Sequence, residues 1–442
     1  MIEKILQLLE EKKYAEIKKE VSEMLVPDIA DLFEELENPA DVVKVFRLIP
    51  KDISADVFSY VSSDLQETIV YAISDSELKA IMEDMYLDDT VDFLEEMPAI
   101  VVQRVLKNSN KQTRELINKF LAYDEDSAGS IMTTEFLDVK SGSTIHNALT
   151  KIRKVGKDIE TISVMYVMDS TRKLLGTLSI KDLLLAEPYQ KVDEIMEDNV
   201  VFAYTHTDKE EISNTFQKYD LIALPIVDNE NRLVGIVTVD DVMEVIEEEA
   251  TEDISKIGGV TPSEDEYLNT SVWRHFGNRI IWVLVMMVFG IFTGLLISKY
   301  ESALATVPML VSFMPVLMNT AGNCGSQSST VIIRGLALNE ITFKDYFKIF
   351  FKEMMVSLLL GLCAIIFMLI RVTIQYDFMK ALIICASLFI VILIANFIGF
   401  SMPMLAKKLK LDPAMMAAPI ITTILDCAVV LVYFNIAQAV LF

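Results

Sequence analysis

The stretch Met165–Asp182, MYVMDSTRKLLGTLSIKD, returns 59 residues later as Leu224–Asp241, LPIVDNENRLVGIVTVDD. In both copies an apolar run is followed by a polar turn that begins with Asp, a second apolar run, and an acidic segment. Short apolar runs bounded by such turns are typical of buried strands, and the acidic segment is typical of a helix start. The repeat therefore predicts two strand–turn–strand–helix units between about residues 126 and 250.

The repeated unit resembles a tandem pair of CBS domains. Its most specific element is Gly-x-x-[Ser/Thr]-x-x-Asp, and the resemblance implies that this element can hold the ribose of an adenine nucleotide such as ATP. The candidate nucleotide residues are Gly176, Ser179 and Asp182 in the first copy, and Gly235, Thr238 and Asp241 in the second. The alternative is a turn glycine and an Asp that caps the next helix.

The segment that leaves the second repeat is strongly acidic. No Lys or Arg lies between Arg232 and Lys256, while the segment holds eight acids. Four of them share one helix face: Asp241, Glu244, Glu248 and Glu252. Like charges three or four residues apart destabilise an isolated helix, so this face is either simply solvated or neutralised by divalent cations. Because the segment leads toward the first apolar run, we expect it to transmit the state of the acidic region to the membrane.

Residues 1–125 are predicted to be helical. Apolar residues recur at helical spacing, and prolines punctuate the units at Pro27, Pro39, Pro50 and Pro98. Repeated units of this kind predict a small superhelix of helix pairs.

Charge and hydropathy divide the chain of 442 residues into two halves. Residues 271–442 hold 12 basic and 7 acidic residues, a balance of +5, so the total of −25 leaves −30 on residues 1–270. An acidic soluble half excludes a nucleic-acid binder, which needs a basic face. All four cysteines lie after residue 270, so a disulfide framework in the soluble half is excluded and a reducing cytoplasm is indicated.

The second half holds long stretches almost free of charge. Runs longer than about 17 residues are candidate membrane spans, and we predict five of them: Ile280–Ile297, Ala303–Ile333, Met354–Ile370, Ala381–Ala406 and Pro413–Phe442. Basic residues gather before the first span, between the second and third, and between the fourth and fifth. The positive-inside rule therefore places the N-terminal region in the cytoplasm and the C-terminus outside a multi-pass cell (inner) membrane protein.

Two features of the spans point to an ion path. The second span contains the polar stretch Asn319–Thr330, which predicts a broken helix whose carbonyl and amide oxygens are available to a cation, with helix packing as the alternative. Asp426 is the single acid inside a predicted span, where an uncompensated carboxylate costs about 2.5–3.5 kcal/mol. Carboxylate and amide oxygens suit Mg²⁺ or Ca²⁺.

The order of these parts resembles the MgtE family of magnesium channels over essentially the whole chain. The motifs that carry the resemblance are Tyr123–Glu135 (YDEDSAGSIMTTE), Glu249–Ile254 (EATEDI), Gly322–Gln327 (GNCGSQ), and Asp412-Pro413 followed by Asp426. The resemblance implies a homodimer with the pore between subunits, closed by a connecting "plug" helix. It also implies that cytosolic Mg²⁺ bridges acids and so holds the closed state.

Carried onto matching positions, the resemblance implies two sets of metal residues. The pore set is Asp426, Asn323 and Gly322, and the regulatory set is Asp88, Asp89 or Asp92 together with Asp208, Asp220, Asp241, Glu244, Glu249, Glu252 and Asp253. Cys324 and Ala418 stand at points of these motifs where neither offers a hard ligand.

The sequence thus predicts a multi-domain membrane protein without enzymatic machinery. Its predicted parts are an all-α acidic domain (1–125), two α/β CBS domains (126–196 and 197–246), an acidic connecting helix (247–272) and a five-helix transmembrane domain (273–442). The predicted function is magnesium uptake through a channel that cytosolic Mg²⁺ closes, with the lipid bilayer, Mg²⁺ and a second copy as partners. The alternatives are a CBS-regulated transporter of Co²⁺, Mn²⁺ or Ca²⁺, or a nucleotide-sensing receptor without transport.

Overall fold

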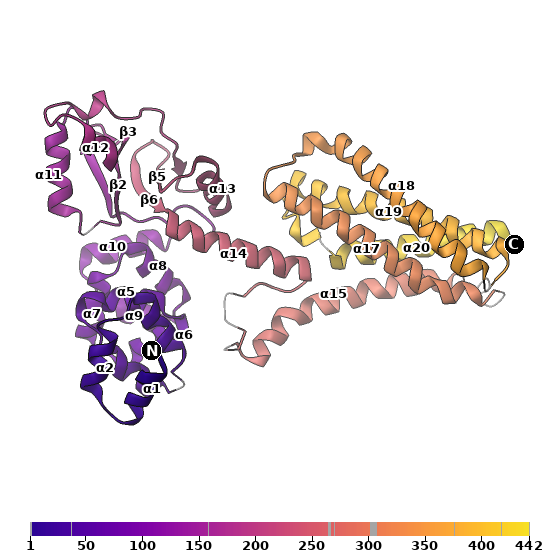
Figure 1. Ribbon diagram of the computed structural model, residues 1–442, viewed down its shortest axis with the longest axis horizontal. Coiled ribbons are helices and arrows are strands. Elements are labelled where there is room, and N and C mark those ends of the chain that lie inside the picture. Colours follow the sequence, from indigo (N-terminus) through magenta and orange to yellow (C-terminus); the bar gives the residue numbers. More distant parts are fainter. Residues whose placement is uncertain are drawn as a thin grey trace. The chain divides into compact units, whose positions relative to one another are not determined.

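The structure is a computed structural model that describes residues 2–36, 38–157, 159–263, 267–268, 270–300, 307–374, 376–416 and 418–441 (Figure 1). The chain forms two compact units, Met1–Ile246 and Glu247–Phe442. Each unit has its own hydrophobic core, as the division into an acidic and an apolar half predicts.

The first unit begins with short helices that stack into a superhelix. Their bounds are α1 (Ile2–Glu10), α2 (Tyr14–Val21), α3 (Val26–Glu34), α4 (Pro39–Phe46), η1 (Lys51–Ile53), α5 (Ser54–Tyr60), α6 (Ser63–Ala72), α7 (Asp75–Asp84), α8 (Leu87–Glu96), α9 (Ala99–Asn108) and α10 (Lys111–Phe120). A ladder of aromatic rings joins successive helices through Phe33, Phe46, Phe58 and Phe93, with ring centroids 5.1–6.3 Å apart. The all-α prediction for this region is confirmed.

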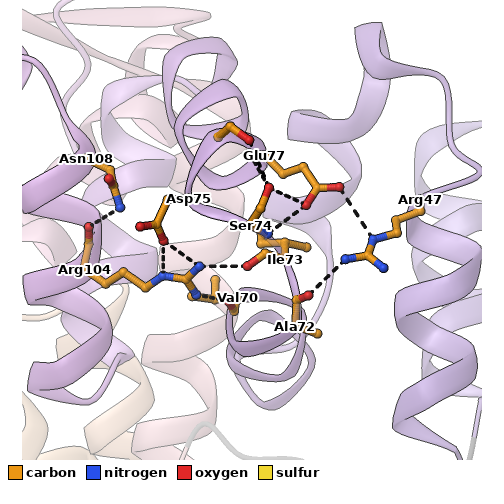
Figure 2. Close-up of polar contacts among 10 residues, drawn as sticks. Arg47, Val70, Ala72, Ile73, Ser74, Asp75, Glu77, Arg104 and Asn108 are labelled. Carbon is orange, nitrogen blue, oxygen red and sulfur yellow. Dashed lines mark hydrogen bonds and ion pairs between the residues drawn. The ribbon is translucent and has the colours of Figure 1, made fainter.

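Two arginines satisfy the carbonyl groups at the turn between α6 and α7 (Figure 2). Arg104 of α9 donates to Ile73 O at 2.8 Å and to Asp75 Oδ1 at 2.8 Å, and it also bonds to Val70 O. From α4, Arg47 donates to Ala72 O at 3.1 Å. Helix ends leave carbonyl groups without partners, so these guanidinium groups both satisfy the turn and fix the spacing of three helices.

Two small sheets follow, one from each sequence repeat. The first has the order β1-β2-β3, built from β1 (Phe136–Lys140), β2 (Thr161–Met168) and β3 (Leu174–Ser179) with helices α11 (Ile145–Val155), α12 (Ile180–Leu185) and η2 (Val192–Glu194). The second has the order β4-β5-β6, built from β4 (Ala203–Tyr204), β5 (Ala223–Val227) and β6 (Leu233–Thr238) with α13 (Lys209–Tyr219). In each sheet the first pair is parallel and the second antiparallel, so the predicted repeat of strand, turn, strand and helix is confirmed.

The repeated glycine of each copy has a packing role. A Cβ on Gly176 would lie 2.9 Å from Glu197 O, and one on Gly235 would lie 2.6 Å from Thr133 O. Each glycine lies in the second apolar strand of its repeat, where a neighbouring backbone segment crosses too closely for a side chain. The repeated Gly thus has a packing role inside a strand in both copies, whereas the alternative interpretation placed it in a turn.

The acidic segment after the second repeat forms α14 (Val239–Gly258). Gly259 follows in a left-handed conformation with φ of +67°, which ends the helix, and the next helix starts at Val272. Among the described residues of the connecting segment predicted for 247–272, the helix that continues from the second repeat ends at Gly258. A glycine with positive φ just past the last turn is a common helix stop, and the sequence Gly258-Gly259 offered that signal.

The second unit contains long helices (Figure 1). Their bounds, with two short 3₁₀ turns, are α15 (Val272–Ser298), α17 (Met309–Ala337), η3 (Phe343–Asp345), α18 (Tyr346–Thr373), α19 (Phe378–Lys408), η4 (Ala414–Met416) and α20 (Ala418–Leu441). Within the described residues, four segments are long and apolar enough to cross a membrane: Val272–Ser298, Phe343–Thr373, Phe378–Lys408 and Pro419–Val440. The second predicted span, Ala303–Ile333, overlaps α17, whose polar stretch keeps its mean hydropathy below that of the other four.

The predicted break in the second span is wrong, because α17 runs without interruption through residues 319–330. Both of its threonines bond within the helix: Thr320 Oγ1 donates to Val316 O at 2.7 Å, and Thr330 Oγ1 donates to Ser326 O at 2.9 Å. Its small residues serve packing, since a Cβ on Gly399 of α19 would lie 2.4 Å from Gly325 O. Small residues let apolar helices approach closely, so the packing alternative describes this stretch better than a broken helix.

Candidate functional site: an acidic cluster and a membrane carboxylate

Carboxylates from separate elements of the first unit gather at one place. Asp88 and Asp89 lie in the first turn of α8, and Asp92 follows one turn later. Asp240 and Asp241 open α14, and Glu160 directly precedes β2. These six residues are called the acidic cluster from here on. Its members come from the helical domain and from both repeats, so the cluster lies where those parts meet.

Burial and mutual repulsion raise the pKa values of five members of the acidic cluster: Asp88, Asp89, Asp92, Glu160 and Asp241. Asp88 is only 6% exposed, and burial raises its pKa well above the usual range, with the charges of Asp241, Asp89 and Glu160 adding to the effect. Its side chain bonds to the neighbouring backbone, where Asp88 Oδ1 accepts the N–H of Asp89 at 3.0 Å. A buried carboxylate without a cationic partner favours its neutral form, which is why these values rise.

Burial is also the largest cause of the raised pKa values of Asp89, Asp92, Glu160 and Asp241. Burial, followed by the charges of neighbouring acids, raises the pKa of Asp89 to about 6 and those of Asp92 and Glu160 to about 8. Burial raises the pKa of Asp241 to about 6 although hydrogen bonds from Thr238 oppose the rise. Within the described part of the chain, none of these carboxylates forms an ion pair with Lys or Arg. The cluster therefore holds negative charge that the protein itself does not neutralise.

One oxygen of the acidic cluster has no hydrogen-bond partner. Glu160 Oε2 is buried and unpaired among the described residues. An orphaned buried oxygen costs about 1–3 kcal/mol, more when charged, unless something outside the chain satisfies it. A hard divalent cation fits this donor set, since Mg²⁺ prefers carboxylate oxygens and water. No three His, Cys, Asp or Glu side chains in the described ranges converge as a preformed metal site, as expected for carboxylates that repel one another.

The acidic cluster includes some predicted regulatory residues and leaves out others. All three candidates of α8 belong to it, as does Asp241, and the charge of Glu244 acts on Asp92. Asp208 instead caps α13, where its Oδ1 accepts the N–H of Glu210 at 2.8 Å, and Asp220 ends that helix with φ of +51°. Glu160 was missed by the sequence analysis, because an isolated Glu before a strand carries no periodic signal.

In the second unit, the end of α14 is held by a lysine. Lys256 Nζ lies 2.6 Å from Asp412 Oδ2, in the segment between α19 and α20, and 2.5 Å from Glu252 Oε1. Burial opposes the charge of Lys256, but its bonds to Asp412 and Glu252 raise its pKa overall. Burial, then the charge of Asp412, raises the pKa of Asp253. The predicted regulatory acids Glu252 and Asp253 thus lie around one cation of the chain, and Glu249 lies one turn earlier on α14.

The predicted pore residues lie on two packed helices. Asp426 is half-buried on α20, and among the described residues no basic side chain pairs with it. On α17, Gly322 faces α20, where a Cβ would lie 3.1 Å from Thr422 Cγ2, one turn before Asp426. Asn323 is exposed, and its Nδ2 lies 3.3 Å from Asn319 Oδ1. A carboxylate and amide groups on adjoining apolar helices are able to handle a hydrated cation through its waters.

The two candidate nucleotide elements differ in their surroundings. Ser179 Oγ donates to the exposed Asp182 at 2.5 Å, and Thr238 Oγ1 lies 2.7 Å from Asp241 Oδ2. Ser179 Oγ also accepts the N–H of Asp182 at 3.1 Å, so Ser179 caps α12 in place of the Asp that the alternative interpretation names. Thr238 Oγ1 instead donates to the side chains of Asp240 and Asp241. Asp241 also belongs to the acidic cluster, so a phosphate group beside it would meet repulsion that is not present at Asp182.

Known proteins share this arrangement over the whole chain. A family model described as a divalent cation transporter matches residues 314–436, a second described as an MgtE intracellular N domain matches residues 24–126, and CBS domains match residues 128–189 and 192–248. The magnesium transporter MgtE of Thermus thermophilus is 36% identical over 428 residues, covering 96% of this chain and 95% of that one. The chain belongs to the MgtE family.

Other MgtE relatives and solved structures agree. The magnesium transporter MgtE of Bacillus subtilis is 30% identical and covers 99% of this chain and 97% of its own. A crystal structure of the cytosolic domain of the Mg²⁺ channel MgtE in complex with ATP covers 55% of this chain and all of its own, with 36% identity and a TM-score of 0.53. As an MgtE-family member with apolar helices, the chain is a membrane protein.

Proposed function

We propose that this chain transports Mg²⁺ across the cell membrane and that Mg²⁺ on its N-terminal side closes the path. The observation that carries the proposal is the acidic cluster, whose buried, mutually repelling carboxylates include the unpaired Glu160 Oε2. The relatives that match nearly the full chain are magnesium transporters, which supports Mg²⁺ as the transported ion. The apolar helices around Asp426 support a path through the membrane.

The proposed regulation follows from charge neutralisation. Mg²⁺ supplies positive charge that compensates the acidic cluster. When Mg²⁺ is bound, Asp88 and Asp89 of the helical domain remain beside Asp241 of α14, and the closed state is favoured. Without it, repulsion drives these acids apart and frees α14, which reaches its Lys256–Asp412 contact at the other end. Further acids lie along the two helices beyond the acidic cluster. On α14 they are Glu244, Glu249, Glu252 and Asp253, and on α13 they are Asp208 and Asp220.

Transport is tested with the full chain in proteoliposomes that contain a Mg²⁺-sensitive dye. We expect Mg²⁺ entry in the intact protein and a loss of at least about tenfold in Asp426→Asn, which keeps the shape of the side chain but removes its charge. Asp377→Asn, on an exposed loop acid, serves as the matched control. Equal flux in both variants would refute the role of Asp426. Flux of Co²⁺, Mn²⁺ or Ca²⁺ in preference to Mg²⁺, or no flux at all, would favour the alternative functions.

Closure is tested in the same vesicles by adding Mg²⁺ to the side that carries the N-terminal region. Millimolar Mg²⁺ on that side is expected to stop flux in the intact protein. The double variant Asp88→Asn/Asp89→Asn is expected to conduct at the same Mg²⁺ concentration, because its cluster has lost charge that the ion compensates. Closure of the variant at the unchanged concentration would contradict the sensing role.

Two finer proposals accompany this function. We propose that two copies assemble into a dimer with the N-terminal region in the cytoplasm and the C-terminus outside, in line with the basic loops between spans. The solved cytosolic domain of the channel MgtE binds ATP, and we propose that ATP binds here at the first repeat, around Gly176, Ser179 and Asp182. Asp182→Ala is then expected to abolish ATP binding in calorimetry, whereas an equal loss in Asp241→Ala would point to the second repeat.

A further inference from the structure

A second carboxylate lies within the membrane helices, and the sequence analysis placed it outside a span. Glu353 was excluded from the third span, which was predicted to start at Met354, yet α18 begins at Tyr346 and carries Glu353 two turns into the helix. Its carboxylate forms no ion pair with a Lys or Arg of the described residues. Carboxylates within membrane helices are costly, so a specific interaction is expected to hold Glu353 in place.

That interaction is a hydrogen bond from the polar stretch of α17. Ser328 Oγ donates to Glu353 Oε2 at 2.7 Å, and the same hydroxyl lies 3.5 Å from Asn396 O of α19. Ser328 is 5% exposed and Asn396 is 2% exposed, so the contact lies where three helices meet. A hydrogen bond to an ionised acceptor is about twice as strong as a neutral one, and burial increases its effect. Glu353 thus binds α17 to α18 at a buried point.

The same face of α17 fixes the helix that carries Asp426. One turn before Ser328, a Cβ on Gly325 would lie 2.4 Å from Leu425 Cδ1, the residue that directly precedes Asp426. One turn earlier again, Gly322 packs against Thr422. Contacts this close leave α17 little freedom to rotate or slide, because its backbone at the two glycines packs directly against side chains of α20. The rotation of α17 that Glu353 holds is therefore also the rotation that α20 requires.

We propose that Glu353 is a positioning residue for ion transport. Through Ser328, its carboxylate holds α17 in the rotation that sets Gly322 and Asn323 beside the helix of Asp426. Glu353 acts on the path through α17 and does not bind the ion. The consequence for transport rests on the proposed function, whereas the consequence for the α17–α20 contact does not.

The helix contact is measured with a pair of cysteines used as a ruler. A Cβ on Gly322 lies 3.8 Å from Thr422 Cβ, which matches the separation in a disulfide. The double variant Gly322→Cys/Thr422→Cys is made in the full chain after the four native cysteines are changed to Ala. We expect rapid oxidative cross-linking with Glu353 or Glu353→Gln present, since both keep an acceptor oxygen. With Glu353→Leu or Ser328→Ala, cross-linking is expected to slow about tenfold. Equal rates in all four backgrounds would overturn the proposal.

Flux measurements separate positioning from ion binding. In the native-cysteine protein, Glu353→Leu and Ser328→Ala are expected to lower the maximal Mg²⁺ flux about tenfold and change the half-saturating concentration less than twofold. The double variant Ser328→Ala/Glu353→Leu is expected to be no worse than Glu353→Leu alone, because both changes remove one hydrogen bond. Glu353→Gln is expected to keep at least half of the flux, and Glu340→Gln serves as an exposed control.

Each contrary outcome has a defined meaning. A half-saturating concentration shifted more than fivefold by Glu353→Gln would overturn positioning in favour of direct ion binding. Additive losses in the double variant would show that Ser328 and Glu353 act separately, and would also overturn the proposal. If the unaltered chain carries no Mg²⁺ but the cross-linking rates still respond as expected, the proposed function fails while the role of Glu353 in placing α17 stands.

Discussion

Single carboxylates of this chain lie in different surroundings, and the roles proposed for them differ accordingly. Glu160 has an unpaired buried oxygen among like charges, whereas Glu353 has a hydroxyl donor, and Asp426 directly follows Leu425, which packs against Gly325 of a neighbouring helix. The first arrangement favours an outside cation, because nothing in the described chain compensates it. The carboxylate of Glu353 already has a hydrogen-bond donor within the protein, Ser328. The proposed roles of the same residue type are therefore sensing in one unit and helix placement in the other.

The unpaired oxygen of Glu160 leads to a prediction about stability. Burial and the charges of Asp241 and Asp240 raise the pKa of Glu160 to about 8, so its charged form is disfavoured in the fold. Glu160→Gln removes that charge, and in EDTA at pH 8.5 we expect stabilisation on the order of 1–2 kcal/mol after allowance for solvent screening. Thermal unfolding of the full chain in detergent measures the change.

The matched control for this variant is Glu187→Gln, which changes an exposed Glu of the same unit. The control is expected to leave the melting temperature unchanged with and without Mg²⁺. Glu160→Gln is also expected to reduce the stabilisation that Mg²⁺ gives, because one ligand charge is lost. An unaltered response to Mg²⁺ would exclude Glu160 from the ion's surroundings.

At the scale of elements, the sequence predicted periodic features well and isolated ones poorly. The strand–turn–strand–helix repeat and the acidic face of α14 follow from spacing within one element. Glu160 joins Asp241 only through tertiary folding. The polar stretch of α17 was misread because its Thr side chains bond backward to their own helix, which polarity alone does not reveal. Glu353 was missed because charge was used to mark the span's edge.

The crossing of α17 and α19 gives a prediction at the same scale. A Cβ on Gly399 would lie 2.4 Å from Gly325 O, and backbone atoms cannot move aside without separating the helices. Gly399→Val is expected to destabilise the membrane unit by at least about 3 kcal/mol, seen as a lower melting temperature and a lower yield of folded protein. Gly277→Val on α15 is expected to be tolerated, because no atom of the described residues outside its own helix backbone and chain neighbours lies within 4 Å of the added Cβ. A comparable loss of melting temperature in both variants would show that the close crossing of α17 and α19 is not the cause of the destabilisation.

The end of α14 gives a second prediction for an element. Lys256 bonds to both Asp412 and Glu252. Lys256→Met keeps the length of the side chain but removes its charge, so the carboxylates of Asp412, Glu252 and Asp253 then repel one another without a cation between them. In a chain that Mg²⁺ closes, we expect the variant to need about five- to tenfold more Mg²⁺ for closure, the size of one lost charge-assisted contact. Lys218→Met on α13 is the exposed control. A lower requirement for Mg²⁺ would show that Lys256 competes with the ion instead of supporting closure.

At the scale of the whole molecule, the charge of −30 on residues 1–270 is concentrated where it can respond to cations. Part of it lies in the acidic cluster, within a unit whose fold brings the helical domain and both repeats together. Net charge alone would favour solubility. Buried negative charge has a different effect: the repulsion between buried carboxylates destabilises the folded unit, and only protons or bound cations relieve it. The stability of the first unit is therefore expected to depend on pH and Mg²⁺ together.

The direction of the pH effect follows from the raised pKa values. Asp89 and Asp241 have pKa values of about 6, and Asp92 and Glu160 of about 8, whereas such groups titrate near 4 when unfolded. Their stabilising protons are fully bound below about pH 4 and are lost as the pH rises through 6 and then 8. In EDTA, the fragment 1–246 is thus expected to melt about 5–10 °C lower at pH 8.5 than at pH 5.

Mg²⁺ is expected to remove most of that difference, because it compensates the carboxylates that protons no longer neutralise. The fragment is a fair test object, since it forms a compact unit and the related cytosolic domain was solved by itself. The window from pH 5 upward avoids Asp169 and Asp193, whose pKa values are lowered by hydrogen bonds from Thr171 and Ser141. A variant with Asp88→Asn, Asp89→Asn and Glu160→Gln is expected to melt at nearly the same temperature across this window, with or without Mg²⁺. If it keeps the full pH dependence of the unaltered fragment, the acidic cluster is not the source of the repulsion.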